Sequence, residues 1–367
     1  MIIKEMIKKL FFFIFAIFFP FTLVKAENSP VKAAEFKPGE MIIEHITDAH
    51  EWHILSIGNT HISIPLPIIL WHEGKLHIFC YSKFHHGQSD YGGFRYMTDG
   101  AYKNKIIYVG NNSLGNENKS PTIPLDFSIT KNVASLFLSV IALIIIFLTV
   151  ARAYKRNEKH APKGLQSLLE PIIIFVRDDI AKSSLGEKHY ERFTPYLLTV
   201  FFFIFFNNLL GIVPFFPGGA NVTGNITVTM MLALFTFLIT NLSGNRHYWQ
   251  DIFNTPGIPW WLKIPIPILP LIEFLGLFTK PFVLMVRLFA NMTAGHIIVL
   301  GFMSLIFVFG NINPAFGYGI SLISILMSIF ISLLEILVSF LQAFVFTLLS
   351  ALYFGMATEE IENSNHK

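Results

Sequence analysis

The chain has 367 residues, of which 53% are hydrophobic, 14% are charged and 39 are phenylalanine. This balance, with its long uncharged runs, is typical of a polytopic membrane protein. The net charge of +3 is too small to indicate nucleic-acid binding, and the single cysteine, Cys80, excludes an intrachain disulfide and a cysteine-built metal site. Because the sequence has no Gly-rich phosphate loop of the Walker type, nucleotide chemistry would belong to a partner, and we expect no cofactor and no metal.

Residues 1–26 have the pattern of a secretory signal peptide. A basic start is followed by an apolar core from Leu10 to Val24 and by the small residue Ala26. The core is shorter than the roughly 20 residues that a spanning helix needs. The alternative is an uncleaved anchor, and in both cases the following segment lies outside the cytoplasm.

Residues 27–125 are rich in Gly, Pro, Asn and His, with short alternating apolar runs such as those that begin at His61 and Lys105. This pattern predicts a small β-rich extracytoplasmic domain. Eight of the 13 histidines lie between His45 and His86. A metal site or a proton-collecting surface is one interpretation. We favour exposed histidines on a solvated β domain, since no two of them hold a tight zinc-ligand spacing.

Residues 126–367 form the predicted membrane domain, and its first span runs from Val133 to Val150. Five basic residues and one acid follow the span before position 164, so the positive-inside rule places this loop in the cytoplasm. The segment Leu165–Leu185 has an apolar middle but also carries Arg177-Asp178-Asp179. That segment is too charged to span and is typical of an interfacial helix.

The second and third predicted spans are Pro195–Val213 and Ile226–Leu242, and five prolines between positions 256 and 270 then interrupt any helix. Two long segments follow, at about 271–309 and 316–357. Each exceeds the length needed to cross a ~30 Å core upright, so we expect both to be tilted. The fold class is therefore an all-α membrane protein with about five membrane helices, an interfacial helix and a small β-rich N-terminal domain. Counting crossings places the N-terminus outside the cytoplasm and the C-terminus in it.

Few charges occur in the two long segments. Between positions 264 and 357 the formally charged residues are Glu273, Lys280, Arg287 and Glu335. Helix residues seven apart differ by about 20° in direction, so the first three line one stripe, which Asn291 joins one turn later. His296 follows Arg287 by nine residues and is rotated roughly 180° away from it. On the last helix, Glu335 and Gln342 share a second stripe.

Arg287 lies inside an apolar helix with no carboxylate within one helical turn. A cation in the middle of the bilayer costs about 2.5–3.5 kcal/mol, which favours a functional role over snorkelling or pairing with a distant acid. A guanidinium does not lose its proton in proteins. Arg287 therefore cannot relay protons, but it can attract a passing carboxylate and keep it ionised. His296 and Glu335 can gain and lose protons.

The stretch Arg287–Gly295, RLFANMTAG, resembles the signature of subunit a of the rotary (F-type) ATP synthase. Further stretches in the same order are similar to that family: Pro195–Gly211, Asn225–Asn241 and Glu335–Glu360. The resemblance covers residues 130–360 and leaves out the first 125.

The resemblance implies a non-catalytic, proton-translocating stator subunit of the bacterial inner membrane. Its implied partners are a rotating c-ring of small subunits that each carry one carboxylate, a b-type peripheral-stalk subunit, the soluble ATPase sector and lipid, but no nucleic acid. Two half-channels would serve the ring, one open to each side of the membrane. Arg287 matches the arginine that faces the ring and separates them, while Asn291 and Gln342 match an asparagine and a glutamine of the family.

The sequence departs from the commoner bacterial pattern at two places. Many bacterial relatives carry an acid after the Ala-Gly and a histidine on the last helix, whereas this chain has His296 and Glu335, an arrangement that resembles the mitochondrial form. If the swap conserves one acid and one imidazole in the same half-channel, the two side chains should lie in contact. Many relatives also have an acid before the asparagine where this chain has Thr223-Gly224-Asn225, and Asn225 is a possible lining residue.

Structural roles are the alternatives at these positions. Glu273 and Lys280 lie near the start of their helix, where an anchoring role is favoured over channel lining. Gln342 could join two helices by hydrogen bonds, and His296 with Glu335 could form a buried structural pair. For the whole chain, the alternatives are a secondary transporter that binds an anion at Arg287 and a membrane-anchored scaffold. The absence of an internal repeat in the sequence disfavours the transporter.

Overall fold

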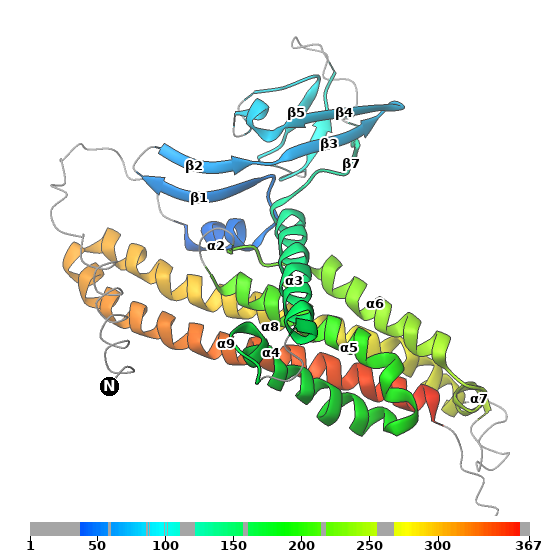
Figure 1. The fold of residues 1–367 in the computed structure, drawn as a ribbon. Coiled ribbons are helices and arrows are strands. Elements are labelled where there is room, and N and C mark those ends of the chain that lie inside the picture. Colours follow the sequence, from blue (N-terminus) through cyan, green and yellow to red (C-terminus); the bar gives the residue numbers. More distant parts are fainter. Residues whose placement is uncertain are drawn as a thin grey trace, which may run out of the picture. The chain divides into compact units, whose positions relative to one another are not determined.

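The computed structural model describes residues 37–57, 60–85, 87, 89–98, 100, 102–110, 122–156, 161–213, 218–254 and 268–359. Figure 1 shows the elements in chain order. The predicted signal peptide, the histidine at position 86, most of the prolines between 256 and 270 and the acidic C-terminus lie outside these residues.

Five helices in the described part of the chain are long and apolar enough to cross a membrane. They are Lys131–Arg156, Leu165–Ile212, Ile226–Ser243, Leu271–Ile312 and Pro314–Thr358. Lys131–Arg156 is helix α3, and Ile226–Ser243 is helix α6. The predicted first and third spans lie inside these two helices. The protein is therefore mostly helical and fits a polytopic membrane protein, as its composition predicts.

Helices α8 (Ile268–Ile312) and α9 (Pro314–Thr358) have 45 residues each and lie side by side as an antiparallel hairpin (Figure 1). Asn313 alone separates them, and its side chain caps α9 by accepting a hydrogen bond from the Ala315 amide at 2.9 Å. The sequence predicts a five-residue break here, but Pro314 occupies the first turn of α9, where its missing N–H is not needed. At 1.5 Å per residue each helix is about 68 Å long, more than twice a ~30 Å bilayer core. Tilting remains our prediction for both.

The charged segment after α3 is helical and packs into the bundle. It consists of α4 (Leu165–Ile174), the π-helical turn η2 (Phe175–Lys182) and the start of α5 (Ser183–Ile212). The chain bends at Gly186, whose φ of 71° is open to glycine at little cost. Val176 and Ile180 are fully buried against α5 and α9, while Arg177 turns outward and bonds Asp178 at 2.8 Å. The sequence predicts an interfacial helix here, and its depth in the bilayer remains a prediction.

The helical core lies where η2, α5, α6, α8 and α9 meet. Phenylalanines from distant segments stack there: Phe193 of α5 lies 4.9 Å from Phe354 of α9, measured between ring centroids. Leu284 and Leu288 of α8 contribute the buried side of that helix. Burial of each such side chain stabilises a water-soluble fold by about 1.5–3 kcal/mol, but between membrane helices close packing replaces that driving force.

The described residues of the N-terminal segment contain helix α2 (Pro38–Ile46), the 3₁₀ turn η1 (Tyr81–Phe84) and seven short strands. The strands are β1 (Glu51–Ile57), β2 (Thr60–Pro65), β3 (Pro67–His72), β4 (Lys75–Cys80), β5 (Phe94–Tyr96), β6 (Ile106–Tyr108) and β7 (Leu125–Asp126). They form three small antiparallel sheets, β1-β2, β4-β3-β7 and β5-β6. The runs predicted from His61 and Lys105 correspond to β2 and β6. Ile68, Leu70 and Phe94 form part of a separate small core.

Three histidines of this segment pack on aromatic rings. His72 lies 4.2 Å from Tyr108, His77 lies 5.0 Å from Phe94 and His50 stacks 6.2 Å from Tyr81, all between ring centroids. His50 is buried and its Nε2 lies 3.4 Å from a carboxylate oxygen of Asp126. Among the described residues, no group of three or more His, Cys, Asp or Glu side chains is arranged to hold a metal ion.

Candidate functional site

His296 of α8 and Glu335 of α9 lie opposite each other inside the hairpin. His296 Nδ1 is 3.8 Å from Glu335 Oε1, and the two side chains are only 10% and 12% exposed. The prediction that these side chains lie in contact is confirmed. Gly295 makes the approach possible, because an added Cβ there would collide with Glu335 Oε1 and lie 3.1 Å from its Cδ.

Both ring nitrogens of His296 face carbonyl oxygens. Nδ1 lies 2.9 Å from the Met292 carbonyl, and Nε2 lies 3.1 Å from the Gly211 carbonyl at the end of α5. A neutral imidazole carries one N–H and can donate to only one of these acceptors, whereas an imidazolium can donate to both. His296 therefore has a possible acceptor opposite each ring nitrogen, and the Glu335 carboxyl group lies beside Nδ1.

A chain of buried polar groups continues from Glu335. Ser339 Oγ donates to the Glu335 carbonyl at 2.7 Å, Asn208 Nδ2 donates to the Ser339 carbonyl at 3.5 Å, and Thr223 Oγ1 donates to Asn208 Oδ1 at 2.6 Å. Asn208, Thr223 and Ser339 are fully buried. Burying polar groups in an apolar interior costs free energy unless they are hydrogen-bonded. The hydrogen bonds of Ser339, Asn208 and Thr223 offset that cost.

Two buried acceptor atoms along this chain have no hydrogen-bond donor among the described residues. They are Glu335 Oε1 and Asn207 Oδ1. Asn207 uses its Nδ2 on the Phe203 carbonyl at 2.8 Å, so its oxygen is left over. No role for Asn207, Asn208 or the Thr223 hydroxyl is predicted from the sequence. The signal that could have found them is the Asn-Asn pair directly after the phenylalanine-rich run 201–206, since paired amides are unusual in an apolar helix.

Arg287 lies on the open side of α8. It is exposed, as is Asn291 one turn later, and Arg287 forms no ion pair with any residue that the structure describes. Leu284 and Leu288, which lie about 60° and 100° from Arg287 around the helix, are almost completely buried. The helix therefore divides its groups as the periodicity predicts, with Arg287 facing out and His296 turned toward α5 and α9.

The remaining predicted residues have separate surroundings. Lys280 is half-buried, with its Nζ 5.5 Å from the centroid of the Tyr353 ring on α9, while Glu273 is exposed. Asn225 caps α6 by accepting a hydrogen bond from the Thr227 amide at 2.9 Å. Gln342 is buried on α9, two turns after Glu335. None of these four contacts the His296–Glu335 pair in any hydrogen bond or ion pair of the described residues.

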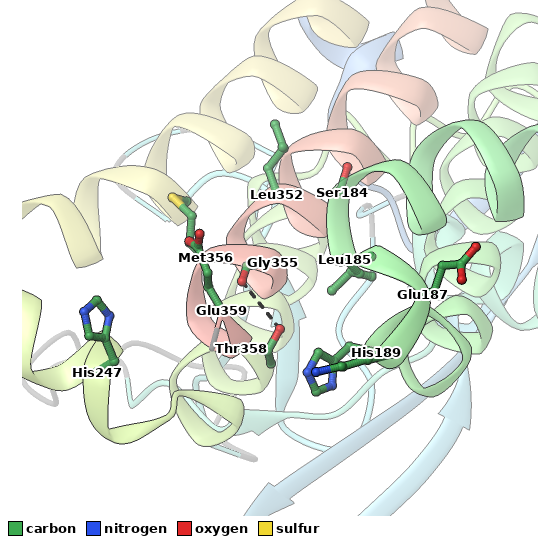
Figure 2. A pocket seen from close by; sticks show the side chains of 12 residues that line it. Ser184, Leu185, Glu187, His189, His247, Leu352, Gly355, Met356, Thr358 and Glu359 are labelled. Atoms are coloured by element: carbon green, nitrogen blue, oxygen red, sulfur yellow. Dashed lines mark hydrogen bonds between the residues drawn. The ribbon is translucent and has the colours of Figure 1, made fainter. Parts of the chain in front are cut away.

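A cavity of about 840 Å³ lies apart from this pair, where α5, α7 (Arg246–Asn254) and α9 come together. Figure 2 shows that Leu185 and His189 line it from α5, His247 from α7, and Met356 from α9. None of the predicted site residues lines this cavity. The cavity lies at the C-terminal end of α9.

Comparison with known proteins decides the family. The family described as ATP synthase A chain matches residues 135–355. The chain belongs to the ATP synthase subunit a family. It is 46% identical over 239 residues to ATP synthase subunit a of Chloroherpeton thalassium. The aligned region covers 63% of this chain and 67% of that protein. It is 45% identical over 262 residues to ATP synthase subunit a 2 of Chlorobium luteolum. This aligned region covers 67% of this chain and 72% of that protein.

The subunit a match falls on the part of the chain where the sequence signature predicts it. The pair His296 and Glu335, the exposed Arg287 and the buried Asn208 and Thr223 all lie inside it. The N-terminal segment is outside this match. A second family, described as a domain of unknown function (DUF8433), matches residues 41–127, a range that includes strands β1 to β7 of the described residues.

Proposed function

We propose that this chain is the non-catalytic, proton-translocating subunit a of an ATP synthase membrane sector. It would provide two half-channels to a rotating c-ring, with Arg287 between them. The observation that carries the proposal is the exposed Arg287 guanidinium on α8, which has no acid of the described chain to neutralise it. Membership of the subunit a family supports the proton-translocating role.

The division of charge on α8 supports separate tasks for its two sides. Arg287 keeps its charge at any accessible pH, so it can draw a ring carboxylate into its ionised form but cannot pass a proton on. An acid that arrives protonated must release its proton before it pairs with Arg287. Asn291, on the same open side, would hydrogen-bond a carboxylate that passes there.

The other side of α8 supports one half-channel. His296 and Glu335 would exchange protons with water and with ring carboxylates, and the buried chain through Ser339, Asn208 and Thr223 would line the path. The oxygens of Glu335 and Asn207 that accept no hydrogen bond from the described residues would give a proton or a water molecule places to bind along this path. Gln342, two turns after Glu335 on α9, is a further proposed lining residue of this half-channel. Lys280, packed on Tyr353, suits an anchor better than a lining residue.

The same proposal includes the surroundings of the chain. The partners would be the c-ring subunits, a b-type peripheral-stalk subunit and, through the stalks, the soluble ATPase sector. The chain would be a multi-pass protein of the bacterial inner membrane with its strands outside the cytoplasm and its C-terminus inside. Co-purification tests this: the tagged chain should emerge with a ring of small membrane subunits and a soluble ATPase. Its recovery as a stable protein without them would contradict the proposal.

An anion transporter is the weaker alternative. Neither the 840 Å³ cavity nor the small cavity beside Lys280 is lined by Arg287, so neither would bring an anionic substrate to the guanidinium. Uptake of an organic anion by the purified chain alone would favour the transporter.

Gly295→Ala should lower proton-driven ATP synthesis by about tenfold, because a misplaced reacting group costs at least that much. The added methyl group would displace the Glu335 carboxylate from His296. Gly301→Ala on the same helix is the matched control, since nothing lies within 4 Å of the added Cβ. Rates of ATP synthesis in proteoliposomes under an imposed proton gradient check this. Equal rates for the two variants would contradict the role of Gly295.

A further inference from the structure

Trp52, in strand β1 of the N-terminal segment, is buried against the loop that joins α5 to α6. Its side chain is only 4% exposed and forms one apolar cluster with Ala220 and Val222. Ala134 and Leu136 of α3 and Val228 of α6 complete this cluster at its edge. The indole therefore fills the space between the starts of two membrane helices and the loop that precedes α6.

The chain just before Trp52 is fixed to the start of α3. The Ala49 carbonyl accepts a hydrogen bond from the Lys131 amide at 2.8 Å, and Asp48 Oδ1 accepts one from the Asn132 amide at 3.0 Å. Lys131 Nζ also donates to the His45 carbonyl at 3.2 Å. These bonds satisfy amides at the first turn of α3, which have no partner inside the helix. The start of α3 thus holds the chain before Trp52, and the α5–α6 loop packs on its side chain.

The two loop residues that Trp52 covers adjoin the His296–Glu335 site. The Ala220 carbonyl would lie 3.6 Å from a Cβ at Gly211, and the Gly211 carbonyl is the one that His296 Nε2 faces. Val222 is followed by Thr223, the buried donor to Asn208. The loop therefore lies against Gly211, whose carbonyl faces His296, and supplies Thr223 at one end of the buried hydrogen-bonded groups.

We propose that the N-terminal segment acts through Trp52 to position the 218–225 loop for proton transfer through His296 and Glu335. Trp52 is a positioning residue, since it touches neither of them. This inference rests on the proposed function. It gives residues 41–127 a task in the membrane sector: they hold in place the backbone carbonyl and the hydroxyl group that order the site.

The effect should be visible in the pH dependence. The titratable group that faces His296 is Glu335 of α9; α5 presents the Gly211 carbonyl, and the 218–225 loop has no charged side chain. If the loop shifts, the Gly211 carbonyl moves relative to His296 Nε2. Proton transfer through the His296–Glu335 pair should then slow, and the pH profile of the rate should change.

Reconstitution of the whole ATP synthase in liposomes tests this, with ATP synthesis measured while the pH on the proton-supplying side is varied. Trp52→Ala should lower the rate by about tenfold and change its pH profile. The matched control is Trp71→Ala, because Trp71 lies in the same segment but is 45% exposed. That variant should stay within about twofold of the unchanged complex. An unchanged rate and pH profile for Trp52→Ala would overturn the inference.

A double substitution separates positioning from general stability. Because Trp52 is proposed to act through Thr223 and its neighbours, Trp52→Ala combined with Thr223→Ala should be less damaging than the product of the two single effects. Fully multiplicative effects would count against the inference. If Trp52→Ala does not assemble, Val222→Ala trims the other side of the same contact and should lower the rate and change the pH profile in the same way. An unchanged rate and pH profile for Val222→Ala would overturn the inference as well.

Arg287→Ala in the same series separates this inference from the function on which it rests. Coupled synthesis by Arg287→Ala would reject the proposed function itself. Loss of synthesis with Arg287→Ala, together with an unchanged Trp52→Ala profile, would reject only the positioning role of Trp52.

Discussion

Replacing Arg287 with alanine should abolish proton-driven ATP synthesis while leaving the complex assembled. The guanidinium is the one permanent charge on the open side of α8 between Lys280 and the end of that helix. Without it, no fixed charge would force a passing carboxylate to release its proton, and the two half-channels would no longer be separated. Loss of a preorganised charge at a reacting centre costs about 100-fold or more. The measurement is the initial rate of synthesis in proteoliposomes, normalised to the assembled complex.

Two further substitutions sharpen this prediction. Arg287→Lys should also fail, because a lysine covered by a partner can lose its proton and does not offer the planar fork of a guanidinium. Val286→Ala, at an exposed neighbouring position, is the matched control and should retain the rate of the unchanged complex. Coupled synthesis by Arg287→Ala at a normal rate would reject the proposed mechanism.

Glu335→Gln should give the second largest effect. The amide keeps the shape of the side chain but cannot take up or release a proton. Positioned acid–base groups contribute about 100-fold or more, so we expect a loss of that size. His296→Gln should give a loss of the same order. Because the two side chains face each other at 3.8 Å, the double swap His296→Glu with Glu335→His keeps one acid and one imidazole in place.

The double swap is the discriminating variant. The double swap should synthesise ATP at least about tenfold faster than the slower of the two single variants. The reason is that one acid and one imidazole would carry the proton whichever helix holds each of them. Leu333→Ala, exposed on α9, serves as the control for a change of the same helix. A double swap no better than either single variant would show that each position needs its own residue. Normal synthesis by Glu335→Gln would remove the pair from the path.

The membrane helices and the division of α8 could be predicted from the sequence, because both depend on local pattern. Long apolar runs identify the spans, and the helical repeat separates Arg287 from His296 by about half a turn of the helix. That His296 meets Glu335 came from the resemblance to subunit a, since periodicity cannot say which side of α9 faces α8. The close approach also depends on Gly295, whose missing side chain leaves room for the carboxylate.

The rest depends on long-range packing. The segment around Arg177 looks too charged to enter a bundle, but Val176 and Ile180 share one side and are fully buried, while the charges face outward. The bond from Thr223 to Asn208 and the contact of Trp52 with Val222 join segments that no local pattern relates. These contacts exist only once the helices have packed, so propensity and periodicity do not reveal them.

The central claim is that Arg287 meets mobile acids of a second protein on the open side of α8. The most direct test is a structure of the intact complex, with the distance measured from the Arg287 guanidinium to the nearest carboxylate. We predict a carboxylate of a small membrane subunit at about 3–6 Å, in direct contact or bridged by one water molecule. A guanidinium paired with an acid of its own chain, with only lipid over this side of α8, would contradict the account.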